Sequence, residues 1–318
     1  MRLLMLVTGP FAVPTFHAFF NTRHSVTALV TAPSRTHRGQ PVAPTSSIRE
    51  VAREHGTPIF DPEDVNAPEA QAQLAGYTAD LLITCDYGQI LSSATLATAR
   101  HGGVNLHAAL LPKYRGAAPI NWAIYHGETE TGVTVIHMTP RIDAGPSIAQ
   151  ARVAIGADET SAELEVRLAQ VGARLMCEAI DLIEAGRAQP LPQDASQASK
   201  APRLKKTDGQ IDWSRSAAAL KNHVRAMEPW PKTHTFWRRA DGPPVRLILG
   251  PLAVVETGTA DRPPGTVIEA GDGRLVIAAG AGAVAPKSIQ PSGKRLLPVD
   301  EFLRGYHVRP GERFGPEL

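Results

Sequence analysis

Short apolar runs alternate with helix-like stretches through the first half of the chain. Leu3–Val7 and Ser25–Thr31 are apolar runs of strand length, and the helical stretch Pro14–Phe20 lies between them. Ser47–His55 is again helix-like, and Asp80–Cys85 follows as a third short strand. This order of strands and helices is typical of a parallel sheet covered by helices. The first half is therefore predicted to be an α/β domain.

Two more strands and one long helix complete this expected domain. Val104–His107 and Thr131–Met138 read as strands, the second with β-branched residues in near-alternation. Thr160–Glu163 matches a capping box, and apolar residues then recur at steps of four and three as far as Leu182, shortly before Gly186. This spacing predicts one amphipathic helix that packs on the sheet.

A polar stretch separates the second half of the chain from the first. Residues 189–203 are rich in Pro, Ser, Ala and Gln and predict a linker between a domain at 1–188 and another at 204–318. In the second domain Ala217–Ala226 is helix-like. Short β-like runs with Gly, Pro and Asp turns follow, at Val245–Val255, Gly265–Glu269, Arg274–Ala279 and Ser288–Gln290. Such spacing is typical of a small barrel or sandwich.

Length, cysteine content and charge narrow the class of protein. At 318 residues the chain predicts about two domains, and Cys85 and Cys177 are too few for a disulfide framework. No apolar run approaches the ~18 residues of a membrane helix, and Gly and Pro after Val7 break the apolar start before a signal peptide can form. We therefore expect a cytoplasmic protein without a membrane segment. Residues 201–318 carry 18 Lys and Arg against 12 Asp and Glu. That excess indicates either a polyanionic partner or a chance fluctuation.

Several common catalytic signatures are missing from the sequence. Thr8-Gly9-Pro10-Phe11 follows the first strand in place of G-x-G-x-x-G, so a nicotinamide site is not expected. No G-x-x-x-x-G-K-[ST] loop and no G-x-S-x-G elbow occur. The eleven histidines lack the spacing of zinc ligands, so no metal is predicted.

Asn105 and His107 are the first candidates for chemistry. They are two positions apart on an expected strand, so both side chains leave the same face. At the carboxyl end of that strand they point to the crevice where open α/β sheets bind ligands. Asp143 follows the next strand and can orient the imidazole. The same residues also suit a buried histidine bonded to Asn105 and an aspartate that stabilises a turn, and the spacing alone does not decide between these interpretations.

The segment around these residues resembles a known family. Asn105–Ile120, which reads NLHAALLPKYRGAAPI, is similar over nearly every position to the signature of the formyltransferases that use 10-formyltetrahydrofolate. Further similar segments extend over nearly the whole chain: Phe11–Pro14, Tyr87–Leu91, Thr131–Thr134, Ile142–Gly145, Ile211–Trp213, Arg225–Pro231 and Gln290–Lys294. The resemblance implies a Rossmann-like formyltransferase domain followed by a C-terminal, OB-like small β-barrel domain.

The resemblance also implies the reaction and its residues. An amine attacks a formyl carbon, Asn105 donates to the oxyanion, His107 moves the amine proton or stabilises the oxyanion, and Asp143 orients His107. The donor 10-formyltetrahydrofolate is expected against two loops, with contacts from Asp86, Tyr87, Gly88, Gln89, Ile90, Leu110, Leu111 and Pro112. Ala109 stands where the family usually has Ser, Pro146 where an acidic residue is common, and Asp86 where a small apolar residue is usual. These departures leave the three catalytic positions intact.

Within the family, the basic loop near residues 35–39 resembles members that act on initiator methionyl-tRNA. Arg35 and Arg38 are the expected contacts there, and in the second domain we select Lys205, Lys206 and Arg225 as phosphate contacts. A flexible solvated loop and ordinary surface charges are the alternative interpretations. The chain is expected to act as a monomer. Transfer to amino-sugar nucleotides and an impaired RNA-binding relative remain open as other functions.

Overall fold

The computed structural model describes residues 1–33, 36–37, 40–41, 47–239, 242–255 and 262–316. The chain folds into two compact units. The first comprises Met1–Pro119, Glu130–Ala154 and Glu163–Pro202. The second comprises Ile120–Thr129, Ile155–Ala162 and Arg203–Leu318. The second unit therefore draws two short segments from the first half of the chain.

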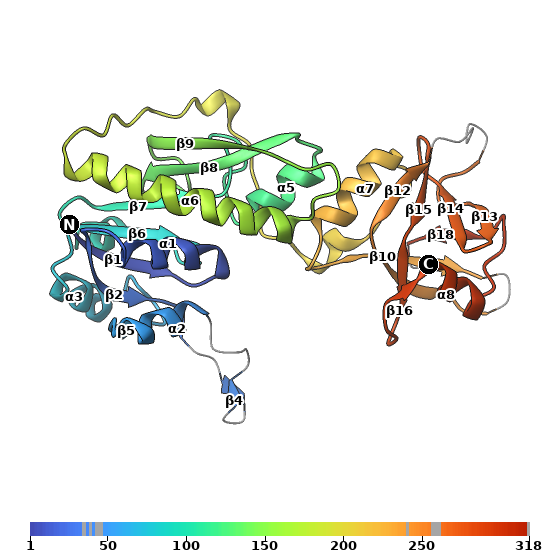
Figure 1. Cartoon of the computed structure of the whole chain (residues 1–318), viewed down its shortest axis with the longest axis horizontal. Helices are drawn as coiled ribbons and strands as arrows, with labels where there is room; N and C mark the ends of the chain where they lie inside the picture. The colour runs from blue at the N-terminus through green and yellow to red at the C-terminus, as the bar shows by residue number, and fades with distance from the viewer. Residues whose placement is uncertain (34–35, 38–39, 42–46, 240–241, 256–261, 317–318) are drawn as a thin grey trace. The chain divides into compact units, whose positions relative to one another are not determined.

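A seven-stranded sheet forms the centre of the first unit (Figure 1). Its order is β5-β2-β1-β6-β7-β8-β9, with β1 (Arg2–Val7), β2 (Ser25–Val30), β5 (Ile59–Phe60), β6 (Leu81–Cys85), β7 (Gly103–His107), β8 (Glu130–His137) and β9 (Ser147–Ala154). Strands β1 and β6 are buried almost along their whole length, as their continuous apolar sequences require. The predicted α/β class is confirmed.

Two strands differ from the expected parallel sheet. Strands β5, β2, β1, β6 and β7 pair in parallel, but β8 pairs antiparallel with both β7 and β9. The prediction of a wholly parallel sheet is therefore wrong at this edge. Strand β9 was not expected at all. Its side chains alternate between half-buried and exposed, because it lies at the sheet edge, and its Ala, Gln and Arg residues carry little strand signal.

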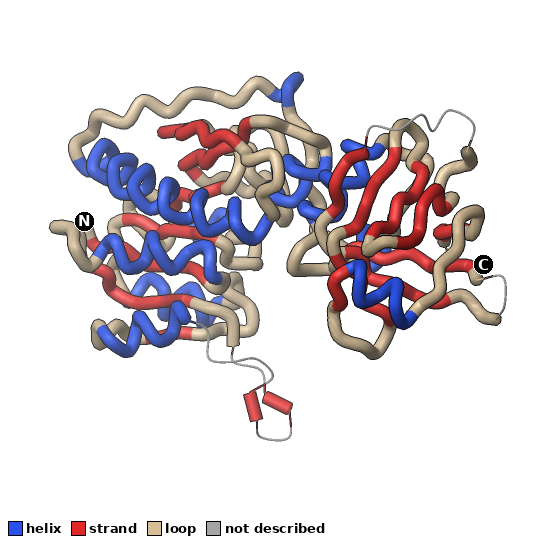
Figure 2. Tube along the Cα trace, turned by 45° about the vertical axis from the view of Figure 1, so that its right-hand side comes forward, coloured by secondary structure: helices blue, strands red, loops and turns tan. Residues whose placement is uncertain are grey.

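Helices cover this sheet. They are α1 (Val13–Phe19), α2 (Ser47–Glu54), α3 (Pro68–Gly76), α4 (Ser93–Leu96) and α6 (Ser161–Glu184). The first unit also contains the short 3₁₀ turns η1 (Pro10–Ala12) and η2 (Ala195–Gln197). Strands β3 (Thr36–His37) and β4 (Gln40–Pro41) form a separate hairpin. Helix α6 is the predicted amphipathic helix, and Figures 1 and 2 show it lying along the sheet. A Cβ at Gly172 of α6 would lie 2.7 Å from Leu106 of β7, so this glycine permits close packing beneath that strand.

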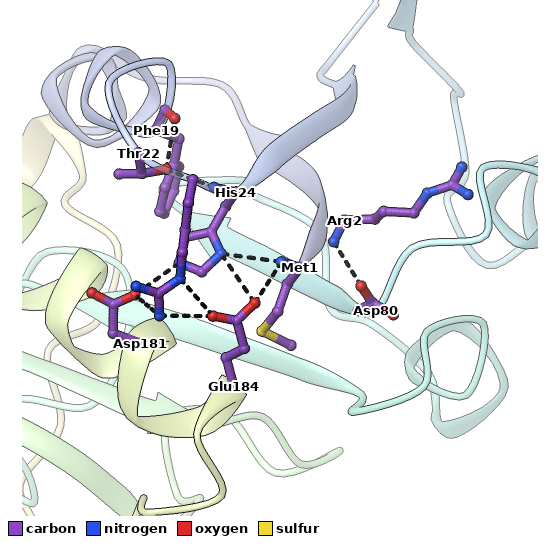
Figure 3. Close-up of polar contacts among 9 residues, drawn as sticks. Met1, Arg2, Phe19, Thr22, His24, Asp80, Asp181 and Glu184 are labelled. Atoms are coloured by element: carbon purple, nitrogen blue, oxygen red, sulfur yellow. Dashed lines mark hydrogen bonds and ion pairs between the residues drawn. The ribbon is translucent and has the colours of Figure 1, made fainter.

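An ion-pair group ties the end of α6 to the start of β1 and β2 (Figure 3). The Met1 amine lies 2.9 Å from Glu184 Oε1 and 3.2 Å from Nδ1 of the buried His24, whose Nε2 lies 3.2 Å from Asp181 Oδ1. The amine donates to Nδ1, and Nε2–H donates to the carboxylate, which is the neutral tautomer of His24. Arg23 pairs with both carboxylates at 2.7 Å. Two cations thus meet the two acids of this group.

The second unit consists of two antiparallel sheets. One has the order β17-β16-β11-β10-β18 and the other β12-β15-β14-β13. The strands are β10 (Thr233–Arg238), β11 (Val245–Leu249), β12 (Leu252–Val255), β13 (Val267–Gly271), β14 (Arg274–Ala278), β15 (Ala283–Pro286), β16 (Ser288–Pro291), β17 (Leu297–Pro298) and β18 (Arg313–Gly315). Helices α5 (Pro119–Tyr125), α7 (Ala217–Ala226) and α8 (Val299–Gly305) and the turn η3 (Lys206–Gly209) accompany them.

The core of this unit is built from aromatic and aliphatic side chains of both sheets and α7. Trp213, Leu220, Trp237, Phe302 and Phe314 are among its buried residues. The predicted small β-rich second domain is confirmed in its class, and the sheet arrangement is consistent with an OB-like barrel. The expected run 245–255 is two strands, because the Gly-Pro step at 250–251 interrupts it and the chain passes there from one sheet to the other.

The stretch predicted as a linker makes backbone pairs within the first unit. Leu191 exchanges two 2.8 Å hydrogen bonds with Ser147, and Arg115 is paired with Ser199 and Ala201. None of the described helices is both long enough and apolar enough to cross a lipid bilayer.

Candidate active site

Asn105 and His107 lie on β7, between β6 and β8. Thr84 of β6 is the register partner of Asn105, and its hydroxyl donates to Asn105 Oδ1 at 2.9 Å. The other end of the amide faces a carboxylate, because Asn105 Nδ2 donates to Asp143 Oδ1 at 3.2 Å. These two partners assign the orientation of the amide. Nδ2 carries a second hydrogen, and that donor remains available for a substrate oxygen.

Asp143 reaches the site from the loop between β8 and β9. Its carboxylate accepts a hydrogen bond from Gly116 N at 2.9 Å through Oδ2, and the same oxygen lies 3.5 Å from His107 Nδ1. The residue has φ +48°, in the left-handed region that L-residues adopt at a cost. The structure thus brings together the three side chains that the sequence pattern selected.

The backbone of Tyr114 determines the tautomer of His107. His107 Nε2 lies 2.8 Å from the Tyr114 carbonyl oxygen, which can only accept, so Nε2 carries a hydrogen. Nδ1 is then the ring nitrogen without a fixed hydrogen, and it faces Asp143. His107 is 5% exposed.

The loop after β6 carries the first set of expected folate contacts, residues 86–90. Thr8 N and Gly9 N donate to the Asp86 carbonyl at 3.1 and 3.3 Å, and Thr8 Oγ1 donates to the Tyr87 carbonyl at 3.1 Å. Gln89 Oε1 accepts from Val65 N at 2.9 Å. These bonds attach the loop to its neighbours and leave the Ile90 side chain 59% exposed.

Two titratable side chains in this loop are shifted by their surroundings. Burial and the nearby Asp64 raise the pKa of Tyr87, whose hydroxyl is buried and has no hydrogen-bond partner among the described residues. Burial also raises the pKa of Asp86. The Asp86 carboxylate occupies the space that any side chain at Gly9 would fill, so the glycine permits the unusual aspartate. The Tyr87 ring packs in the hydrophobic core of the first unit. A buried hydroxyl without a partner is the kind of group that a ligand or a water can satisfy.

The second set of expected folate contacts, Leu110, Leu111 and Pro112, follows β7. Leu111 N donates to Thr134 Oγ1 at 3.2 Å, and Gln150 Nε2 donates to the Leu111 carbonyl at 3.0 Å, so β8 and β9 hold this turn. Leu111 is buried, and Leu110 packs against Gly132. Because β6 and β7 are adjacent and parallel, the loops that follow them leave the same edge of the sheet.

The expected tRNA contacts have different outcomes. Arg35 and Arg38 lie outside the described residues. Lys205 and Lys206 are exposed at the start of the second unit. Arg225 is 9% exposed and donates at 3.0 Å to the carbonyls of Gly156 and Glu159, and burial lowers its pKa. Its Nη1 thus serves contacts inside the second unit, and its selection as a phosphate contact stays a prediction.

Sequence reasoning missed four residues that shape this site. Thr84 was overlooked because it lies in an apolar strand, although a single Thr in such a run indicates a hydroxyl with a specific hydrogen-bonding role. Tyr114 and Gly116 contribute backbone groups, whose direction no side-chain pattern reveals. Gln193 lies in the stretch interpreted as a linker, and its side chain contacts the Asp143 loop.

Comparison with known proteins gives matches over most of the chain. Residues 1–180 match the formyl transferase family, and residues 203–307 match the formyl transferase C-terminal domain. The chain belongs to the formyl transferase family. The family inferred from the Asn105–Ile120 segment is thereby confirmed.

Full-length relatives of this formyl transferase are closely similar. The methionyl-tRNA formyltransferase of Rhodopirellula baltica is 42% identical, with 98% of this chain and 96% of the relative covered. That of Citrifermentans bemidjiense is 38% identical, with 99% and 96% covered.

Solved structures share the fold of this formyl transferase. The N-formyltransferase of Helicobacter canadensis, solved with folinic acid and dTDP-3-aminofucose, matches with a TM-score of 0.68 at 15% identity, over 90% of this chain and 98% of its own. HypX of Aquifex aeolicus, solved with tetrahydrofolic acid, matches with a TM-score of 0.59 at 17% identity, over 95% of this chain and 46% of its own. These likenesses support the fold class.

Proposed function

We propose that the chain transfers the formyl group of 10-formyltetrahydrofolate to the α-amino group of initiator methionyl-tRNA. The observation that carries this proposal is identity of 38–42% over nearly the whole length to methionyl-tRNA formyltransferases, in a chain whose Asp143 carboxylate contacts both Asn105 and His107. We further propose that it acts in the cytoplasm as a monomer, with a catalytic domain at 1–188, a linker at 189–203 and a tRNA-binding domain at 204–318.

The contacts of the three side chains support a direct transfer. The amine nitrogen forms a bond to the formyl carbon, the carbon–N10 bond of the folate breaks, and one proton passes from the amine to N10. The free hydrogen of Asn105 Nδ2 donates to the oxyanion, a contact of the kind worth roughly 3 kcal/mol when it is prepositioned. His107 Nδ1 moves the proton, and Asp143 stabilises the protonated ring 3.5 Å away.

The proposed donor site fits a folate in chemical character. The tetrahydropterin is a small bicyclic heterocycle whose pyrimidine ring carries several hydrogen-bonding groups. The loop at 86–90 offers the exposed Ile90 side chain and the buried Tyr87 hydroxyl, which has no hydrogen-bond partner among the described residues. Leu111 and Pro112 supply an apolar wall at the same sheet edge. We propose these residues, with Asp86, Gly88, Gln89 and Leu110, as folate contacts.

The proposed tRNA contacts are basic side chains that water reaches. Lys205 and Lys206 are exposed, and phosphate contacts of this kind position a nucleic acid and weaken with salt. Arg35 and Arg38 remain predictions from the sequence. Arg225 also stays a prediction from the sequence; its Nη1 donates to two backbone carbonyls and its Nε to Asn222 Oδ1.

Formyl transfer to separate acceptors tests the proposal. The purified full chain is incubated with 10-formyltetrahydrofolate carrying a labelled formyl group and, in separate tubes, with initiator methionyl-tRNA or an amino-sugar nucleotide. We expect label on the tRNA with the unchanged protein and with His307→Ala, which alters an exposed histidine. We expect loss of at least about a hundredfold with His107→Ala. Label on the sugar alone would overturn the acceptor, and no label on either would overturn the reaction.

A further inference from the structure

We propose that Gln193 is a positioning residue for Asp143. We propose also that the stretch 191–201 fixes the loop that carries Asp143 and the loop that carries Arg115 relative to each other. This inference rests on the proposed function, since Asp143 is a proposed member of the reacting site. Gln193 lies far from Asp143 in the sequence, within a segment whose composition indicates only a linker. In the first unit, however, its side chain lies between the two loops that shape the site.

The side-chain amide of Gln193 uses both of its ends. Nε2 donates to the carbonyl oxygens of Asp143, at 2.9 Å, and of Gly145, at 2.7 Å. Oε1 accepts from Arg115 Nε at 3.1 Å and from Arg115 Nη2 at 2.6 Å. A glutamine amide has two N–H donors and an oxygen with two lone pairs, so all four positions are occupied. This is a complete set of hydrogen bonds on a half-buried side chain.

The Asp143 end of this contact needs support. The residue has φ +48°, a conformation that a non-glycine residue keeps only where its surroundings enforce it. Its carboxylate is held by Asn105 Nδ2 and Gly116 N. Its own carbonyl and that of Gly145 are held by Gln193. The side chain and backbone of Asp143 are thus fixed by different partners, and Gln193 supplies the backbone part.

The Arg115 end acts on the other half of the site. Arg115 stands between Tyr114, whose carbonyl accepts from His107, and Gly116, whose N–H donates to Asp143. Arg115 N donates to the Ser199 carbonyl at 2.9 Å, and its carbonyl accepts from Ala201 N at 2.7 Å. The stretch 191–201 therefore holds the Arg115 backbone, while Gln193 in the same stretch holds its guanidinium.

Loss of the hydrogen bonds of Gln193 should misplace Asp143 relative to His107 Nδ1 while leaving the residues proposed to bind folate unaltered. Gln193 makes no contact with residues 86–90 or 110–112 among the interactions of the described residues. A displacement of about 1 Å in a reacting group is enough to cost about a hundredfold in rate. The expected signature is a fall in kcat with KM for the folate donor nearly unchanged.

Three variants of the full chain test the assignment by steady-state formyl transfer. Gln193→Ala removes all four bonds and should lower kcat by about 10- to 100-fold, with KM for 10-formyltetrahydrofolate within about twofold. Gln193→Glu keeps an acceptor for Arg115 but presents a carboxylate to the two carbonyls, so it should be as impaired as Gln193→Ala. Gln197→Ala, at an exposed glutamine of the same stretch, should match the unchanged protein. Full activity in Gln193→Ala, or rescue by Gln193→Glu, would overturn the assignment to Asp143.

Hydrogen–deuterium exchange gives a second readout that needs no activity. The amide of Gly116, which donates to Asp143, and the amides of residues 143–145 and 147 should exchange faster in Gln193→Ala, whereas those of β1 and β6 should not change. Unchanged exchange at residues 116, 143–145 and 147 would overturn the proposal, and so would faster exchange throughout the first unit, which indicates general loss of stability. If the unchanged protein transfers formyl to no acceptor, the proposed function fails, and exchange alone decides the role of Gln193.

Discussion

Acidification below pH 6.5 should destabilise the second unit through His223 of α7. The imidazole is 2% exposed, and its Nε2–H donates to the Asp208 carbonyl at 2.6 Å. Nδ1 is buried and has no hydrogen-bond partner among the described residues, so the folded protein holds the neutral ring. Protonation would place an unpartnered N–H and a charge in the interior. Burial lowers the pKa of His223 to about 4.

The charges around His223 act in both directions. The Asp208 carbonyl and carboxylate raise its pKa, whereas Arg215 and His234 lower it, and burial exceeds all of these effects. Tyr125 packs edge-on against the ring with centroids 5.1 Å apart, and the Arg215 guanidinium lies over the same tyrosine. These neighbours leave no acceptor for a proton on Nδ1.

The size of the effect follows from the two pKa values. The ordinary value is 6.5 and the folded value about 4, a difference of about 2.5 units, and each unit corresponds to about 1.36 kcal/mol. Between these pH values the unfolded chain binds a proton that the folded chain does not, so the free energy of unfolding falls as pH falls. This stability is present above about pH 6.5. About 3 kcal/mol of it is lost by the time the pH has passed through about 4.

Tryptophan fluorescence can isolate the unit that contains His223. The four tryptophans, Trp122, Trp213, Trp230 and Trp237, all belong to the second unit. Urea unfolding of the full chain followed by this signal at a series of pH values gives the free energy of unfolding of that unit. His223→Gln keeps an N–H for the Asp208 carbonyl but does not titrate. It should remove a slope of up to about 1.4 kcal/mol per pH unit between pH 4 and 6.5.

The comparison has a clear control and a clear failure. His307→Gln alters an exposed histidine and should follow the unchanged protein at every pH. If the curves of the unchanged protein and His223→Gln stay parallel from pH 6.5 to 4, the folded state accommodates the protonated ring. The reasoning from burial would then be refuted.

Three further predictions follow from single contacts. Gly116 has φ +125°, and Gly116→Ala puts a Cβ 2.5 Å from the Ala201 carbonyl oxygen. The free energy of unfolding in urea should therefore fall by about 1–3 kcal/mol, and formyl transfer should fall more than about tenfold. Normal values for both would contradict the close approach. Thr84→Val removes the donor to Asn105 Oδ1 and should lower kcat about 3- to 10-fold without altering the melting temperature, whereas Thr84→Ser should restore activity. The Met1 amine and then Arg23 lower the pKa of Glu184 to about 2. The stability that the ionised Glu184 contributes is therefore present above about pH 4.5 and lost toward pH 2. Acid unfolding followed by circular dichroism should depend less on pH in Glu184→Gln, and an equal dependence would count against the contacts of Glu184 with Met1 and Arg23.

Much of the fold was predictable because strong local patterns coincide with buried elements. The apolar runs at β1, β2 and β6 lie at the sheet centre, and the apolar spacing after Thr160 became the single helix α6. The antiparallel direction of β8 was not predictable, because strand composition contains no sign of direction. Strand β9 was not predicted for a related reason. An edge strand buries too little surface to require a strongly apolar sequence.

The candidate site was predictable in its side chains and not in its supports. Asn105 and His107 share a face by strand periodicity, and the family resemblance supplied Asp143 and the folate loops. Arg225 shows what residue type leaves open, because a basic residue does not reveal whether its guanidinium also donates to internal carbonyls.

Local sequence patterns were enough to predict the two-part organisation, the α/β class of the first part, the family and the three side chains that we propose to react. Each of these follows from local periodicity or from a contiguous motif. Three features became visible only in the folded chain: which nitrogen of His107 bears the fixed hydrogen, how Thr84 orients Asn105, and that Gln193 holds the Asp143 loop. Those contacts join backbone carbonyls and side chains from segments far apart in the chain. A hydrogen bond depends on where such groups point, and residue order alone does not specify that direction.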